Sequence, residues 1–175
     1  NKKPGGLNEH GIAAYKALDN IAQKEVEYIL EIGGIEIQQN VQLGIDFTIK
    51  DLQKKYDAIF IGIGLSGVNP HKINGEEVKG VVDATEYIHD LRQTNQKSQL
   101  PVGDKVIVIG GGMTAIDIAV QSKKLGASEV TIAYRRDQNH MKASEHEQQY
   151  AQINDVKLSF CYNPIKILSE NGQLT

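Results

Sequence analysis

The chain has 175 residues, which is enough for one ordinary domain or two small ones with a hydrophobic core. Its hydrophobic content of 40%, together with 17 glycines, is typical of a globular protein and excludes disorder. The net charge of −3, without a long run of one sign, gives no support for nucleic-acid or membrane-surface binding, so any basic site must be local.

Cysteine usage and the first residues indicate the cellular setting. The single cysteine, Cys161, excludes an internal disulfide and a four-thiolate metal site, and we expect a cytoplasmic protein without a metal. No apolar stretch reaches the ~20 residues that span a bilayer. The chain starts at Asn1 rather than at methionine, and its start does not resemble a signal peptide, so we expect a piece of a longer protein.

The first 79 residues predict short helices and strands that do not form a recognisable supersecondary unit. Apolar residues at helical spacing predict a helix over 19–32, and the alternation at 35–37 predicts a short strand. Thr48 followed by Asp51 predicts a capping box that opens one or two helical turns. The continuous apolar run 56–64 is typical of a buried strand. We interpret 65–79, which is rich in Gly, Asn and Pro, as a linker, and we place a domain boundary near residue 80.

The second part has a sharper pattern. Asp83 with Glu86 predicts the start of a helix, and a strand over 105–109, a glycine turn, a helix over 113–125 and a strand over 129–134 together predict a βαβ unit with parallel strands. Ser144 with Glu147 predicts a second capping box, for a helix that ends near Ile153. Two more strands are predicted, at 156–162 and 165–168. The sequence therefore predicts an α/β fold.

The turn between the first strand and its helix carries a nucleotide-binding motif. Its six residues fit G-x-G-x-x-A: Gly110, Gly111, Gly112, Met113, Thr114 and Ala115. Gly110 permits the tight turn, Gly112 lets the backbone approach a pyrophosphate, and Ala115 lets the helix lie close to the strand. The anion would rest on the free N–H groups of the helix N-terminus. Because a strand precedes the motif and a helix follows it, we predict nucleotide binding rather than a plain structural turn.

The end of the second strand bears on which nucleotide binds. An NAD site normally has Asp or Glu there, whereas this chain has Arg135 and Arg136, with Lys142 as a nearby third cation. Two guanidinium groups suit the 2′-phosphate of NADP. Arginine can also stack on adenine or bind the pyrophosphate of NAD. A further alternative is that the two arginines bind no nucleotide and only form a solvated strand end. NADP and NAD therefore both stay open.

Other polar residues give weaker signals. The five histidines are scattered, with no i, i+4 pair, and do not predict a metal site. Glu145 and Glu147 flank His146, but the capping box explains Glu147 and the helix dipole favours Glu145, so we predict no catalytic residue here. Hydride transfer between a nicotinamide and a flavin needs proximity rather than a protein acid or base. We expect Asp117 to balance local charge and Cys161 to be a core residue.

Several segments together resemble one family. Gly5-Gly6-Leu7, Gly11-Ile12-Ala13-Ala14-Tyr15-Lys16, Phe60-Ile61-Gly62-Ile63-Gly64-Leu65, the glycine turn and Tyr134-Arg135-Arg136 resemble the flavin- and nicotinamide-binding electron-input module of dihydropyrimidine dehydrogenase and the glutamate synthase small subunit. Within this family the chain is most similar to the bacterial NAD-dependent dihydropyrimidine dehydrogenases, through Gly6 to Lys16 and Met113 to Asp117. The resemblance covers nearly the whole chain.

The resemblance implies two nested dinucleotide-binding domains. Residues 1–79 would be a remnant of the FAD-binding domain with its linker, and 80–175 a Rossmann-like NAD(P)-binding domain, a parallel sheet with flanking helices that is truncated at its C-terminal end. Gly112, Met113 and Thr114 would contact the phosphates of the nicotinamide nucleotide. Arg135, Arg136 and Lys142 would contact its adenosine end. The residues expected along the flavin are Gly5, Gly6, Leu7, Lys16 and Leu43.

The family's activity is hydride transfer from NAD(P)H to FAD, with electrons passed to a partner subunit or domain that carries iron–sulfur and FMN chemistry. The flavin domain's own glycine motif is absent from this chain, so we expect the fragment not to hold FAD. Two hypotheses follow: an oxidoreductase subunit for the parent protein, and a nucleotide-binding module without turnover for this chain. Exposed apolar surface left by missing neighbours would favour a homodimer.

Overall fold

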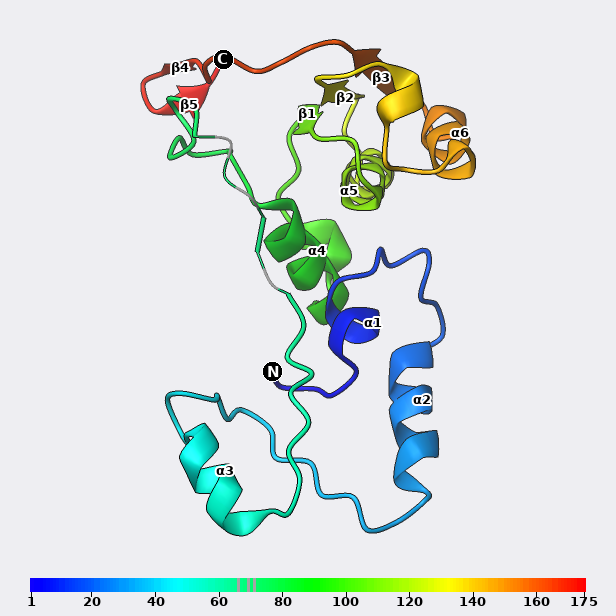
Figure 1. Cartoon of the computed structure of the whole chain (residues 1–175). Helices are drawn as coiled ribbons and strands as arrows, with labels where there is room; N and C mark the ends of the chain where they lie inside the picture. The colour runs from blue at the N-terminus through cyan, green and yellow to red at the C-terminus, as the bar shows by residue number, and fades with distance from the viewer. Residues whose placement is uncertain (66, 69, 71) are drawn as a thin grey trace.

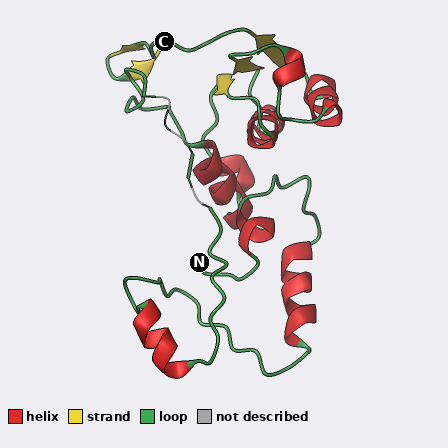
Figure 2. Ribbon diagram, in the orientation of Figure 1, coloured by secondary structure: helices red, strands yellow, loops and turns green. Residues whose placement is uncertain are grey.

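The computed structural model describes residues 1–65, 67–68, 70 and 72–175 (Figure 1). The helices are α1 (Gly6–His10), α2 (Ile21–Leu30), α3 (Ile49–Lys55), α4 (Ala84–Gln93), α5 (Met113–Lys124) and α6 (Glu145–Ile153), with 3-10 turns η1 (Lys97–Gln99) and η2 (Gln138–His140). The strands are β1 (Lys105–Ile109), β2 (Glu129–Tyr134), β3 (Val156–Phe160), β4 (Ser169–Glu170) and β5 (Gln173–Leu174). Every strand that the structure describes lies in the second half of the chain, whereas the described part of the first half contains helices and long loops (Figure 2).

A three-stranded parallel sheet forms the centre of the second half. Its order is β1-β2-β3, and Val108 pairs with Ile132, which pairs in turn with Leu158. Helices α5 and α6 pack against the sheet, and the fully buried Ile116 and Ile132 belong to the core between them. The predicted βαβ unit and the bounds of its two strands are confirmed. The α/β fold class is confirmed as well.

The opposite face of the sheet is open. Ile107 is 71% exposed, and its neighbours across the sheet on that face are Thr131 and then Lys157. Parallel sheets are normally covered on both faces, because their strands are apolar on both. This sheet therefore has an apolar side chain in solvent on its edge strand β1.

The N-terminal segment is fastened to the second half by Arg92 of α4. Its guanidinium group donates to the carbonyl oxygens of Glu9 at 3.0 Å, Ala17 at 2.8 Å and Asn8 at 3.0 Å. Two of these carbonyls belong to α1, whose last C=O groups have no partner within the helix. Arg92, the one arginine outside the Arg135–Arg136 pair, thus has a structural role.

Local signals in the sequence placed the helix starts correctly. The capping boxes of Thr48 with Asp51 and of Ser144 with Glu147 are both present, and Asp83 accepts hydrogen bonds from the first turn of α4. Each satisfies N–H groups that have no partner inside the helix. The predicted helices over 19–32 and 113–125 correspond to α2 and α5.

Three predicted strands were wrong. Residues 35–37 and 56–64 form no ladder, and 165–168 contains only an isolated bridge from Lys166 to Asn74. The apolar run at 56–64 is solvent-exposed, with Phe60 at 95% and Ile63 at 80%. A strand requires a partner for its backbone groups, and no described residue supplies one there. The predicted linker at 65–79 includes Ser66, Asn69 and His71, which lie outside the described residues.

Cys161 was also predicted wrongly. It is exposed rather than part of the core, and it lies just after β3 with a φ of 62°. The chain turns there, and the Cys161 N–H donates to the carbonyl of Arg136 at 3.1 Å. The apolar pattern of 156–162 therefore ends in a turn, not in a longer strand.

Candidate nicotinamide-nucleotide site

The glycine turn joins β1 to α5 and is fixed on both sides. Gly110 has a φ of 145°, and its N–H donates to the carbonyl of Ala133 on β2 at 3.1 Å. The carbonyl of Gly111 accepts hydrogen bonds from the N–H groups of Lys142 and Ala143, at 2.9 and 3.0 Å. The turn is therefore tied both to the sheet and to the loop that leads into α6.

The N-terminus of α5 is open. Gly112 is its N-cap, no side chain caps it, and a Cβ on Gly112 would meet no atom within 4 Å. The first N–H groups of a helix have no intrahelical partner, and the helix dipole favours an anion there. Met113 is 61% exposed and Thr114 is also exposed. The space and the donors fit a phosphate or pyrophosphate group.

The small residue at the end of the motif has the expected packing. Ala115 is buried, and a Cβ on Gly110 would lie 3.6 Å from the Ala115 methyl group. The tightest glycine, however, is Gly111, where a Cβ would come within 2.5 Å of the Tyr134 ring. Sequence reasoning missed this contact because it joins two residues that are 23 positions apart in the sequence.

The arginine pair follows β2 on a well-anchored backbone. The Tyr134 hydroxyl donates to the carbonyl of His140 at 2.6 Å, and the Tyr162 N–H donates to the carbonyl of Tyr134 at 3.1 Å. Arg135 and Arg136 are both exposed. Within the described part of the chain, neither guanidinium group has a hydrogen bond or ion pair. Both positive charges are therefore available to a ligand.

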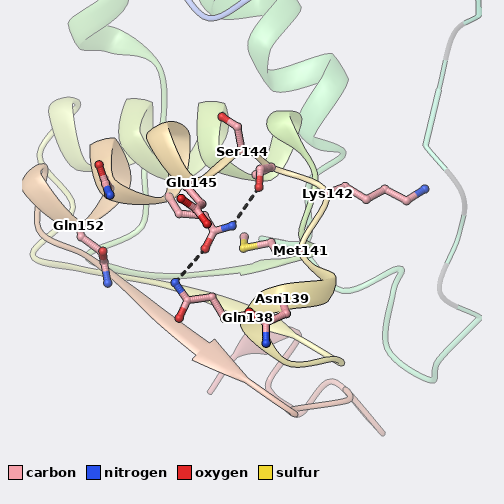
Figure 3. A pocket seen from close by; sticks show the side chains of 10 residues that line it. Gln138, Asn139, Met141, Lys142, Ser144, Glu145 and Gln152 are labelled. Carbon is pink, nitrogen blue, oxygen red and sulfur yellow. Dashed lines mark hydrogen bonds between the residues drawn. The ribbon is translucent and has the colours of Figure 1, made fainter.

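Lys142 lies beside the glycine turn through its backbone. Its side chain is exposed and extends away from the other labelled side chains in Figure 3. Lys142 and its neighbours line a surface groove of about 390 Å³ between η2 and α6. Within this groove the Gln148 side chain accepts a hydrogen bond from Gln138 and donates one to the carbonyl of Ala143. The ten lining residues are Gln138, Asn139, Met141, Lys142, Ala143, Ser144, Glu145, Gln148, Gln149 and Gln152.

The residues matched to flavin contacts lie apart. Gly5 is the N-cap of α1 with a φ of 116°, and Gly6 lines a small cavity of about 210 Å³ together with residues 37–41. Leu7 is 70% exposed, and Leu43 forms an isolated bridge with Phe47. Lys16 lies elsewhere, against α5 and α6. The structure thus brings Gly5 to Leu7 together but does not bring Lys16 to them.

Lys16 and Tyr15 join two helices of the second half. The ammonium group of Lys16 lies 2.7 Å from Oδ1 of Asp117 on α5 and 2.8 Å from Oε1 of Glu147 on α6. The Tyr15 hydroxyl donates to the same oxygen of Asp117 at 3.0 Å. The Ala14 N–H donates to Gln121, one turn further along α5, at 2.9 Å. Asp117 thus balances local charge, as its sequence position suggested.

The environment favours the charged forms of Lys16 and Glu147 and the neutral form of Tyr15. Burial opposes the charge of Lys16, but its hydrogen bonds to the two carboxylates outweigh burial and raise the pKa of Lys16. Burial would raise the pKa of Glu147, yet hydrogen bonds from Lys16 and Ser144 and the Lys16 charge lower it below the ordinary value. Burial and the Asp117 carboxylate raise the pKa of Tyr15. At neutral pH this is an ionic cluster with a neutral phenol.

The described residues contain no group of three or more His, Cys, Asp or Glu side chains placed to hold a metal ion. None of the helices that the structure describes is both long and apolar enough to cross a bilayer. The histidines are not all separate, since the rings of His10 and His89 stack with centroids 5.0 Å apart.

The glycine turn, the open N-terminus of α5 and the parallel sheet are typical of proteins with a Rossmann-like nucleotide-binding domain. The chain belongs to the pyridine nucleotide-disulphide oxidoreductase family, whose model matches residues 5–173. The coarser part of the predicted resemblance, a family of oxidoreductases associated with flavin and nicotinamide cofactors, is thereby confirmed.

Individual proteins are similar over most of this chain. It is 33% identical over 172 residues to the NADP(+)-dependent formate dehydrogenase subunit beta of Moorella thermoacetica, which covers 97% of this chain and 24% of the relative. It is 32% identical over 180 residues to the glutamate synthase [NADPH] small chain of Escherichia coli, covering 98% of this chain and 38% of the relative. The chain thus spans well under half of each relative.

A solved structure shows the same fold. FprA from Mycobacterium tuberculosis, in complex with NADPH, superposes with a TM-score of 0.75 at 18% sequence identity. The superposition covers 97% of this chain and 53% of FprA. The arrangement of the exposed first half and of the parallel sheet therefore recurs in a structure of low sequence identity.

Proposed function

We propose that this chain supplies the nicotinamide-nucleotide site of a flavin-dependent NAD(P)H oxidoreductase subunit. The observation that carries the proposal is the open N-terminus of α5 after a glycine turn, which has donors for a pyrophosphate and no side-chain cap. Arg135 and Arg136, which have no side-chain partner among the described residues, add positive charge at the end of the neighbouring strand. Residues 80–175 would form the nucleotide-binding unit and 1–79 the flavin-side remnant.

Each residue has a defined task in this proposal. The N–H groups at Gly112 to Thr114 bind the pyrophosphate, and Arg135 and Arg136 bind the adenosine end. Lys142 adds a cation at the edge of the turn. NAD(P)H, when bound, supplies a hydride for a flavin. The chain's own contribution is to bind and orient the nucleotide, so no catalytic acid or base is required.

For the parent protein we propose electron transfer to a partner. The preferred assignment is a dihydropyrimidine dehydrogenase type of subunit, with electrons going to an iron–sulfur and FMN partner that reduces a pyrimidine. The alternative is a glutamate synthase small-subunit type. The 32% identity to the glutamate synthase small chain and the formate dehydrogenase relative, which is named as a subunit, support a multi-subunit setting.

For this chain alone we propose nucleotide binding without turnover. The flavin-matched residues support this view, because Lys16 is engaged by two carboxylates away from Gly5 and Gly6. A diaphorase assay with NADPH, added FAD and a dye tests it. Rapid dye reduction by the chain would show that it holds a working flavin, and would contradict the proposal.

Calorimetric titration with NADPH and with NADH at moderate salt tests the binding site itself. We expect binding of at least one nucleotide, and a Gly112→Ala variant should weaken it because a Cβ would occupy the space left for the phosphates. A preference for NADPH of ~1.4 kcal/mol or more, which is tenfold in affinity, would assign the arginines to a 2′-phosphate. Failure of both nucleotides to bind would overturn the proposed function.

A further inference from the structure

We propose that Lys16 is a positioning residue for the nucleotide site: it holds α5 and α6 in the arrangement that keeps the glycine turn open to a phosphate. This inference rests on the proposed function of that turn. It concerns a residue that the family resemblance assigns to the flavin. The structure instead places its ammonium group between carboxylates of two helices.

The two carboxylates need the cation between them. Asp117 and Glu147 have side chains that are only 8% and 14% exposed, and each has an oxygen within 2.8 Å of the same nitrogen. Without Lys16, two poorly solvated negative charges would face each other across the α5–α6 contact. Like charges in such surroundings repel, and either the helices separate or one carboxyl group takes up a proton.

Contacts lead from this cluster to the glycine turn along both helices. Asp117 lies in the second turn of α5, which begins at Met113. Glu147 uses its other oxygen to accept from the N–H of Ser144, the N-cap of α6. The residue before Ser144 donates its N–H to the carbonyl of Gly111. A displacement of α6 would therefore pull on the turn itself.

The charged and titratable groups around Lys16 come from three elements. Tyr15 lies on its own segment, Asp117 on α5 and Glu147 on α6. Lys124 of α5 lies over the rings of Tyr15 and Tyr150, 5.4 and 5.7 Å from their centroids, and does not pair with the two carboxylates. Among the described residues, Lys16 is thus the cation that lies between the two carboxylates and offsets their repulsion.

The test compares Lys16→Met with three other variants of the full chain. Lys16→Arg keeps the charge, and Lys16→Met combined with Glu147→Gln removes the repulsion while Gln still fits the capping box. Lys123→Met is the matched control, because Lys123 is a similarly shielded lysine, 20% exposed, that pairs with Asp155 near the other end of α5. Circular dichroism first establishes that each variant is folded.

We expect Lys16→Met to weaken nucleotide binding about five- to tenfold, while Lys16→Arg, the double variant and Lys123→Met bind as the wild type does. In Lys16→Met the affinity should recover as the pH falls through the carboxyl range, because protonation of one carboxyl group ends the repulsion. The pH series uses NAD⁺, which lacks the 2′-phosphate that itself titrates near pH 6.

A second measurement separates this inference from the proposed function. Amide hydrogen exchange at 111–115 in ligand-free protein should be faster in Lys16→Met than in wild type and Lys123→Met, whether or not a nucleotide binds. If wild type binds no nucleotide but exchange quickens, the proposed function fails and the coupling holds. If Lys16→Met matches Lys123→Met in affinity, pH profile and exchange, Lys16 has no positioning role and the inference is wrong.

Discussion

The ring of Tyr134 lies against the backbone of Gly111, so closely that a Cβ at position 111 would come within 2.5 Å of two ring carbons. The ring cannot easily move away. Tyr134 is buried, and its hydroxyl group is fixed by a 2.6 Å hydrogen bond to the carbonyl of His140. Besides the hydrogen bond from Gly110 to Ala133, the end of β2 and the glycine turn thus share a contact that only glycine permits.

The first prediction concerns this contact. Gly111→Ala should lower the free energy of unfolding by about 1–3 kcal/mol, the usual cost of overpacking a tight interior. Urea-induced unfolding measures it. Gly112→Ala is the control, since its Cβ meets open space and only the N-cap is weakened. Equal stability losses in the two variants would contradict the contact described for Tyr134.

The second prediction concerns the arginine pair. Replacing both Arg135 and Arg136 by Ala should weaken the binding of NADPH at least about tenfold more than the binding of NADH. The reason is that a charge-assisted hydrogen bond to the 2′-phosphate is lost only with NADPH. Calorimetry with each nucleotide measures the difference. Replacing Lys54 and Lys55 of α3 by Ala removes the same charge at a distance and is the control. Equal losses for both nucleotides would refute a 2′-phosphate role.

The third prediction concerns Glu9, a buried carboxylate that accepts from Gln23 and Gln93 and lies 3.5 Å from Lys3. Burial opposes its charge, but these partners outweigh burial and hold the pKa of Glu9 below its ordinary value of 4.5. A lowered folded pKa means that the ionised group stabilises the fold above its unfolded pKa. That contribution is lost as the pH falls through the folded pKa.

The measurement compares urea unfolding of wild type and Glu9→Gln between about pH 3 and pH 6. The difference in unfolding free energy should be largest near pH 6 and should shrink as the pH falls. Glu27→Gln, an exposed position on α2, serves as the control. A difference that stays constant over the range would show that ionisation of Glu9 does not stabilise the fold.

The fourth prediction concerns exposed apolar surface. Ile107 on the open sheet face and Phe60, Ile63 and Leu65 in the first half are all more than two-thirds exposed. We expect the chain to self-associate through such surface, with a mass by light scattering above 19.3 kDa. Ile107→Lys should reduce it if the sheet face takes part. A monomeric mass for the wild type would refute this expectation.

Local signals made the second half of the fold predictable. The strands at 105–109 and 129–134, the helix between them and the two capping boxes all depend on neighbouring residues, and the structure has each of them. The glycine motif likewise placed an open helix N-terminus at Gly112. These features are set by backbone freedom, capping and periodicity, which the sequence displays directly.

Features that depend on distant partners were not predictable. The run at 56–64 has the composition of a buried strand, yet composition cannot supply the neighbouring strand, and Phe60 lies in solvent. Cys161 belongs to an apolar pattern but falls at the turn after β3. Lys16 meets Asp117 and Glu147 across 101 and 131 positions of sequence, a contact without a local signal.

The anchoring of the Tyr134–Arg136 backbone has an entropic consequence. Hydrogen bonds from Tyr162 and Cys161 hold its carbonyl groups, and the Tyr134 phenol holds the loop that follows. An anion that binds there orders the arginine side chains, whereas the main chain is already fixed. Ordering a backbone residue costs about 1–2 kcal/mol, so a pre-set loop spares the ligand that loss and leaves only rotamer freedom to be given up.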